Sequence, residues 1–182
     1  SIFEKALTNL FKKRLFFLVV CFVSFLGFGQ NNIFDIARSG SVAEMKSYLE
    51  QNPKDINSKN QAGFTGLTLA CYRGNDEVAV FLLQNGADIN YVTDSGSALT
   101  GAVVKGNIKI VELLIANNAN LDLQDASGLT ALHFAVQFRN FTMITLLLKS
   151  NANPNIKDNN GLSVLDYANS STDNELKQIL NF

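Results

Sequence analysis

The stretch DASGLTALHFAVQFRNFTMITLLLKSNANPN (residues 125–155) decides how the rest of the chain is interpreted. Its first half combines a turn at Gly128, a Thr130 suited to cap a helix, and apolar residues at helical spacing. Its second half predicts a further helix over residues 141–149 with one apolar face. Helices of about ten residues are marginal alone in water, so each needs a neighbour that covers its apolar face. The stretch therefore predicts a unit that stacks against copies of itself.

The same pattern recurs along the chain at a regular interval. Steps of 33, 32 and 33 residues separate the turn glycines Gly63, Gly96, Gly128 and Gly161. Steps of 32, 33 and 33 residues separate the alanines of the following helix, Ala70, Ala102, Ala135 and Ala168. The words around them agree: TGLTLACYRGN at 65–75, SALTGAVVKGN at 97–107, TALHFAVQFRN at 130–140 and SVLDYANSSTD at 163–173. This recurrence predicts a repeat protein whose copies share one continuous core.

These words resemble the ankyrin repeat, whose T-P-L-H-x-A word recurs every 33 residues. The resemblance covers nearly all of residues 33–182 and points to the exported bacterial type, with a signal peptide. It implies an all-α solenoid of about five stacked helix–turn–helix units with extended β-turn tips. The implied ankyrin domain spans residues 30–182, with an N-terminal cap repeat at 33–57, full repeats at 58–90, 91–122 and 123–155, and a C-terminal cap repeat at 156–182.

The chain departs from the family word in three ways. The proline is replaced in every copy, by Gly66, Ala98, Ala131 and Val164. The third copy is one residue short after Gly96, which predicts an altered turn tip. Arg139 occupies the place of Gly74 and Gly106, where a left-handed residue ends the first helix. A non-glycine residue there costs about 1 kcal/mol, so we expect Arg139→Gly to stabilise the fold slightly.

Residues 1–29 predict an N-terminal extension followed by a signal peptide. A basic Lys12-Lys13-Arg14 precedes the apolar run LFFLVVCFVSFLGF, and the small residues at its end indicate cleavage between Gly29 and Gln30. The run is shorter than the roughly 20 residues that span a bilayer. We therefore expect an exported protein, periplasmic or secreted, with no membrane contact after signal removal. The alternative is a protein anchored in the membrane by an uncleaved signal.

Removal of this segment changes the charge of the chain. Of the 15 Lys and Arg and 16 Asp and Glu residues, four and one respectively lie in residues 1–29, so 11 basic and 15 acidic residues remain and the net charge is −4. Without a basic cluster, nucleic acid is not an expected partner, and we expect a monomer. Cys71 is then the only remaining cysteine, and its place beside Ala70 predicts a buried, inert thiol.

The residues that carry chemistry are sparse. His133 is the only histidine, and the resemblance assigns it a structural role in which it hydrogen-bonds neighbouring backbone. With one histidine and one buried cysteine, neither a nucleophile–base pair nor a zinc site can be assembled in the usual ways. We therefore expect no catalytic residues, no metal and no cofactor.

The remaining candidate is a surface that binds another protein. In ankyrin stacks, partners bind the concave face that the turn tips and first helices form. The matching positions that we select are Phe64, Tyr72, Arg73, Asp94, Val104, Lys105, Leu129, Gln137, Phe138 and Leu162. Exposed aromatic and arginine side chains are favoured at binding hot spots. An alternative interpretation is that some of these side chains fold over neighbouring turns.

The sequence thus predicts an exported, non-enzymatic module that binds a protein partner through its concave face and turn tips. Resemblance to exported bacterial ankyrin proteins implies a guard role, as inhibitor or companion of a co-exported protein. The alternative is a membrane-anchored spacer or scaffold of the cell envelope.

Overall fold

The computed structural model describes residues 32–180. The predicted extension and signal peptide at residues 1–29, with the Gly29–Gln30 cleavage position, lie outside the described residues. Within the described part the helices are α2 (Ile33–Ser39), α3 (Val42–Gln51), a 3-10 helix η1 (Pro53–Asn57), α4 (Gly66–Arg73), α5 (Asp76–Gln84), α6 (Ala98–Lys105), α7 (Ile108–Ala116), α8 (Ala131–Gln137), α9 (Phe141–Lys149), α10 (Val164–Ser170) and α11 (Asn174–Ile179). Two short strands, β1 (Val92–Thr93) and β2 (Gly96–Ser97), form an antiparallel hairpin.

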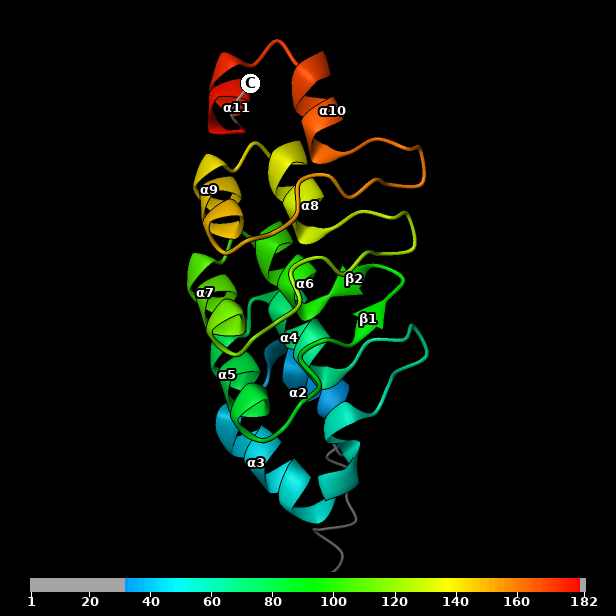
Figure 1. The fold of residues 1–182 in the computed structure, drawn as a ribbon. Coiled ribbons are helices and arrows are strands. Elements are labelled where there is room, and N and C mark those ends of the chain that lie inside the picture. Colours follow the sequence, from blue (N-terminus) through cyan, green and yellow to red (C-terminus); the bar gives the residue numbers. More distant parts are fainter. Residues whose placement is uncertain (1–31, 181–182) are drawn as a thin grey trace, which may run out of the picture. The chain divides into compact units, whose positions relative to one another are not determined.

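The helices form five antiparallel pairs that stack in sequence order, as the repeat pattern predicts (Figure 1). The first helices of the pairs, α2, α4, α6, α8 and α10, pack on one another in one layer. The second helices lie in a parallel layer, and the turn tips project from the side of the first helices. Each predicted segment from 33–57 to 156–182 contains one pair. None of the helices between residues 32 and 180 combines the length and the apolar character that crossing a bilayer requires.

The core runs through all five pairs. The four repeated alanines of the first helices, Ala70, Ala102, Ala135 and Ala168, are completely buried. Their small side chains allow the first helices to approach closely. The second helices contribute larger apolar side chains such as Leu82, Leu114 and Leu147, which are also fully buried. Burial of each contributes about 1.5–3 kcal/mol, so stability is distributed along the stack.

Capping residues begin four of the first helices where the repeat pattern predicts them. Thr65, Ser97, Thr130 and Ser163 each accept a hydrogen bond from a backbone N–H in the first turn. The side chain three residues later accepts in return from the backbone N–H of the capping residue, so each start is a reciprocal capping box.

The turn tips are held by one side chain each. Asn60, Asp125 and Asp158 accept hydrogen bonds through Oδ1 from the backbone N–H groups two and four residues later. In the shortened third copy, Thr93 replaces this residue: its Oγ1 accepts from Ser95 N at 3.1 Å and donates to the Gly96 carbonyl at 2.8 Å. The altered tip expected there is therefore confirmed, and it carries the β1–β2 hairpin.

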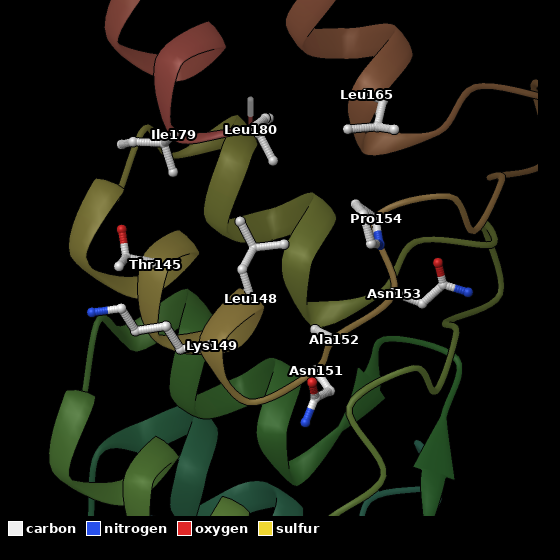
Figure 2. A pocket seen from close by; sticks show the side chains of 10 residues that line it. All are labelled: Thr145, Leu148, Lys149, Asn151, Ala152, Asn153, Pro154, Leu165, Ile179 and Leu180. Atoms are coloured by element: carbon white, nitrogen blue, oxygen red, sulfur yellow. The ribbon is translucent and has the colours of Figure 1, made fainter. Parts of the chain in front are cut away.

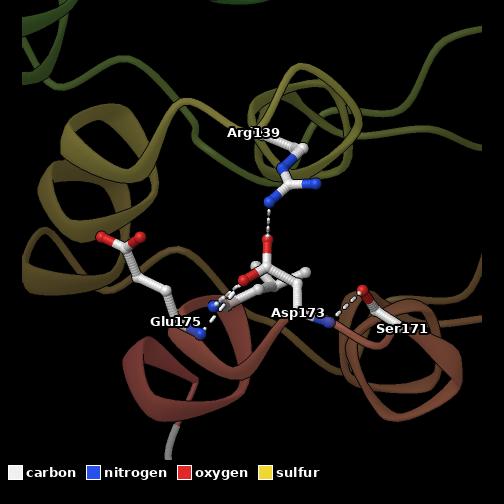
Figure 3. Close-up of polar contacts among 5 residues, drawn as sticks. Arg139, Ser171, Asp173 and Glu175 are labelled. Carbon is white, nitrogen blue, oxygen red and sulfur yellow. Dashed lines mark hydrogen bonds and ion pairs between the residues drawn. The ribbon is translucent and has the colours of Figure 1, made fainter.

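Arg139 has the left-handed backbone that the alignment with glycines predicts. Its φ is +53°, against +76° and +72° at Gly74 and Gly106. Its guanidinium also forms an ion pair with Asp173, the capping residue of α11, with 2.5 Å between Nη2 and Oδ2 (Figure 3). Asp173 Oδ1 accepts from the N–H groups of Glu175 and Leu176. The expectation that Arg139→Gly would stabilise the fold did not include this contact, and it is revised below.

Candidate protein-binding surface

The ten selected residues fall into two sets that successive repeats bring side by side. One set lies at the ends of α4, α6 and α8 and comprises Tyr72, Arg73, Val104, Lys105, Gln137 and Phe138. The other lies on the turn tips and comprises Phe64, Asp94, Leu129 and Leu162. We call these ten residues together the inner face. Since α4 packs on α6 and α6 on α8, the first set follows the stacking direction (Figure 1).

The ten side chains of the inner face differ in their exposure to solvent. Phe64, Tyr72 and Leu129 are half-buried, whereas the other seven residues are exposed. Three of those seven are large hydrophobic residues: Phe138 is 57% exposed, Leu162 is 41% and Val104 is 39%. Within residues 32–180 these are the large hydrophobic side chains that remain exposed, and all three belong to the inner face.

Tyr72 is a structural residue as much as a surface residue. Its ring lies against Gly101 of the next repeat, where an added Cβ would come within 2.7 Å of Cδ2. Its hydroxyl donates to the Ser95 carbonyl, and its ring meets Phe64 edge to face at 5.6 Å between centroids. Burial, with a smaller contribution from Asp125, raises the pKa of Tyr72 to about 12. The interpretation that some inner-face side chains fold over neighbouring turns therefore describes Tyr72.

Phe138 projects from a fixed base. It is the C-cap of α8, and its ring stacks on Phe134 one turn earlier, with 6.4 Å between centroids and 26° between planes. The following residue, Arg139, is held by Asp173. A large aromatic side chain that is exposed but supported on one side offers apolar area at low entropic cost.

The tip residues are positioned through their backbone. The N–H groups of Phe64, Leu129 and Leu162 are the ones that donate to the side chains of Asn60, Asp125 and Asp158. Adjacent tips are also bonded to each other, since Ala126 N donates to the Asp94 carbonyl and Asn159 N to the Ser127 carbonyl. The tip side chains are therefore held at defined places above the first helices.

A family profile described as "Ankyrin repeats (3 copies)" matches residues 33–125 and 99–180. The chain belongs to the ankyrin repeat family. Its curated relatives include the B-cell lymphoma 3 protein homolog of Mus musculus, 37% identical over 105 residues that are 57% of this chain and 21% of the relative. The putative ankyrin repeat protein FPV014 of Fowlpox virus is 35% identical over 107 residues, 58% of this chain and 24% of the relative. The BCL-6 corepressor-like protein 1 of Homo sapiens is 34% identical over 88 residues, 48% of this chain and 5% of the relative.

This chain spans no more than about a quarter of the length of those three relatives. The ankyrin repeat is a generic protein-interaction module and a non-catalytic fold. The activities of the remainder of each relative are therefore not transferred to this chain.

His133 and Cys71 are both buried in the stack. His133 is buried, and its Nδ1 accepts from Thr130 N at 3.1 Å, which confirms the expected structural role. Burial lowers the pKa of His133, and an interaction with the Leu162 backbone opposes part of this shift. Cys71 is a buried free cysteine, and burial raises its pKa to about 12. Within residues 32–180 no group of three or more His, Cys, Asp and Glu residues could hold a metal ion.

The structure also contains a groove that the sequence did not predict. It has a volume of about 730 Å³ and lies where α9 meets the last helix pair, with Leu148, Leu165, Ile179 and Leu180 forming its apolar part (Figure 2). Lys149 and amide side chains from residues 151–153 line the rest. It is adjacent to α11, which has six residues whereas α9 has nine. The groove shares no residue with the inner face.

Proposed function

We propose that this chain is an exported, non-enzymatic module that binds another protein through its inner face. The observation that carries the proposal is the exposure of Val104, Phe138 and Leu162, which are the large hydrophobic residues exposed within residues 32–180 and which all belong to this surface. Isolated exposed hydrophobic residues are common on proteins, but their restriction to one functional surface of a repeat fold is what binding requires.

Phe138 is the expected centre of the interaction. Burial of an exposed Phe side chain against a partner contributes about 2 kcal/mol, and residues of this type dominate measured interfaces. Because Phe134 already supports one side of the ring, little rotational freedom is lost on binding. Leu162 and Val104 extend the apolar contact to the neighbouring repeats.

Export is the second part of the proposal. It is supported by the basic and apolar composition of residues 12–28 and by the small residue before Gln30. An exported ankyrin module suits a guard role, as a monomeric inhibitor or companion of a protein exported with it. Intact mass of the product from the producing cell tests this part. A chain that begins at Gln30 supports it, and a full-length chain found in the membrane fraction supports the anchored scaffold instead.

Binding is tested by crosslinking in the native compartment, with partners identified by mass spectrometry. We expect one protein to be captured by the unaltered chain and by the control Glu112→Ala, an exposed position on the outer helix α7. Phe138→Ser combined with Leu162→Ser should abolish capture without changing the melting temperature, because both side chains are exposed. Undiminished capture by this double variant would refute the proposed surface.

A further inference from the structure

The first helices at the centre of the stack carry charge of one sign. The sequences of α4, α6 and α8, GLTLACYR, ALTGAVVK and ALHFAVQ, contain no Asp or Glu. Their charged residues are Arg73 and Lys105, each in the last turn of its helix. This is opposite to the net charge of −4 that remains after residues 1–29 are removed. The inner face therefore has a local positive charge within an acidic domain.

Arg73 and Lys105 end the adjacent helices α4 and α6, and both side chains are exposed. The Lys105 side chain crosses the end of α4, since a Cβ added at Gly74 would lie 2.9 Å from the Lys105 Cε. Because Gly74 directly follows Arg73, the Lys105 side chain reaches the residue next to Arg73 at the junction between the two repeats. The carboxylate of Asp76 is held at the same junction, where its Oδ1 accepts from Asn107 Nδ2 at 2.6 Å. Within residues 32–180 neither Arg73 nor Lys105 forms an ion pair, whereas Arg38 and Arg139 pair with aspartates.

The apolar part of the inner face begins beside this pair. Val104 is adjacent to Lys105, and Phe138 occupies in the next repeat the position that Lys105 has in its own. Each is exposed. Along the stack, the surface at the helix ends thus changes from two cations to an exposed aromatic ring within one repeat.

We propose that the inner face recognises an extended segment of its partner that carries an acidic residue and a large apolar residue. This rests on the proposed function and specifies the partner's chemistry. The carboxylate lies against Arg73 and Lys105, because two exposed cations that form no ion pair within residues 32–180 favour an anion. The apolar side chain packs on Phe138. Neighbouring helices are roughly 8–10 Å apart, and an extended chain advances about 3.3 Å per residue. The acidic and the apolar residue of the bound segment are therefore about three positions apart.

A nucleic acid would not fit this charge distribution. The ten residues of the inner face include two cations, Arg73 and Lys105, and one exposed carboxylate, Asp94. Non-specific binding of a phosphate backbone draws on many cationic contacts. A short acidic and apolar peptide needs only one carboxylate site and one apolar site, which this surface supplies.

The test is a selection of random displayed peptides against the full chain. We expect enriched peptides to carry Asp or Glu about three positions from Phe, Leu, Ile or Trp. One enriched peptide is then synthesised and titrated by fluorescence anisotropy. Arg73→Glu with Lys105→Glu should weaken its binding at least about tenfold, and added salt should weaken binding to the unaltered chain. The matched control is Lys46→Glu with Lys109→Glu, which makes the same charge change at exposed positions on outer helices and should leave affinity unchanged.

The outcomes separate this inference from the proposed function. If enriched peptides show no acidic preference, or bind the Arg73→Glu and Lys105→Glu variant equally well, yet lose binding with Phe138→Ser, the acidic partner is refuted and the binding surface stands. If neither change affects binding, both proposals fail. Enrichment of basic peptides, or of none, also overturns the inference. Circular dichroism melts of every variant confirm that it is folded.

Discussion

Replacement of Gly101 by alanine tests how tightly successive repeats are locked together. Gly101 lies inside α6 and is buried. A helix-interior Gly→Ala change normally stabilises a protein by about 0.5–1 kcal/mol, because glycine loses more backbone freedom on folding. Here the new Cβ would lie 2.7 Å from Cδ2 and 3.0 Å from Cε2 and Cγ of Tyr72. Contacts this short cannot persist, so the ring must move.

The Tyr72 ring cannot move without loss. Its hydroxyl donates to the Ser95 carbonyl of the next repeat, and its ring makes an edge contact with Phe64 of its own repeat. Overpacking of this kind costs about 1–3 kcal/mol, and a lost hydrogen bond costs about 1 kcal/mol. Since these exceed the gain in helix propensity, we expect Gly101→Ala to destabilise the fold by about 1–2 kcal/mol. In a domain of this size the melting temperature should fall by roughly 3–6 °C.

The assay is a double-mutant cycle with urea and thermal unfolding followed by circular dichroism. In a Tyr72→Ala background the obstruction is absent, so Gly101→Ala should become stabilising by about 0.5–1 kcal/mol. In a Tyr72→Phe background the ring remains and the change should still destabilise. If Gly101→Ala stabilises the unaltered chain as much as it stabilises Tyr72→Ala, the ring does not lock the repeats and the reasoning is refuted.

Three further predictions concern single contacts. Arg139→Gly should destabilise the unaltered chain, because it leaves a nearly buried Asp173 carboxylate without its cation. In an Asp173→Asn background the same change should stabilise the fold by about 1 kcal/mol, because only the backbone strain at position 139 is then removed. Thermal melts of the four proteins give the sign of the stability change in each background. A hydrogen bond from the Tyr167 hydroxyl, and to a smaller extent one from the Leu162 N–H, lowers the pKa of Asp158 from 3.8 to about 2. The Asp158 carboxylate therefore stabilises the fold fully above about pH 4, and this stabilisation is lost as the pH falls to about 2. Asp158→Asn should therefore be less stable at neutral pH and lose less stability over that acidic range, and equal acid sensitivity would contradict this. Cys71, with a pKa of about 12, should react with a disulfide reagent at neutral pH only in denaturant, and rapid reaction of the folded chain would exclude its burial.

Local features of the fold could be predicted from the sequence in detail. The α9 helix has the expected bounds, Phe141–Lys149, and Thr130 caps α8 as its position in the repeat predicts. Such features depend on residues a few positions apart, and the repeat motif recurs several times, so each copy predicts the same local structure. The shortened third tip was also visible, because one missing residue changes a turn whatever surrounds it.

The candidate surface was only partly predictable. Ten residues were selected from the sequence, and the exposed large hydrophobic residues of the described part, Val104, Phe138 and Leu162, are all among them. The sequence did not distinguish these exposed residues from Tyr72, whose ring packs against Gly101 of the next repeat. Whether a side chain is exposed depends on contacts with residues about 30 positions away in the next repeat, and the sequence of one repeat does not specify these contacts.

The repeat architecture, the helix starts and the buried alanines follow from the sequence alone. Each is determined by the spacing of nearby residues and by a motif that recurs along the chain at a regular interval. The tertiary structure alone decided the Arg139–Asp173 ion pair, the passage of Lys105 over Gly74, and the groove between α9 and the last helix pair. These contacts join side chains of neighbouring repeats, where position in space rather than order along the chain determines which charges and rings meet.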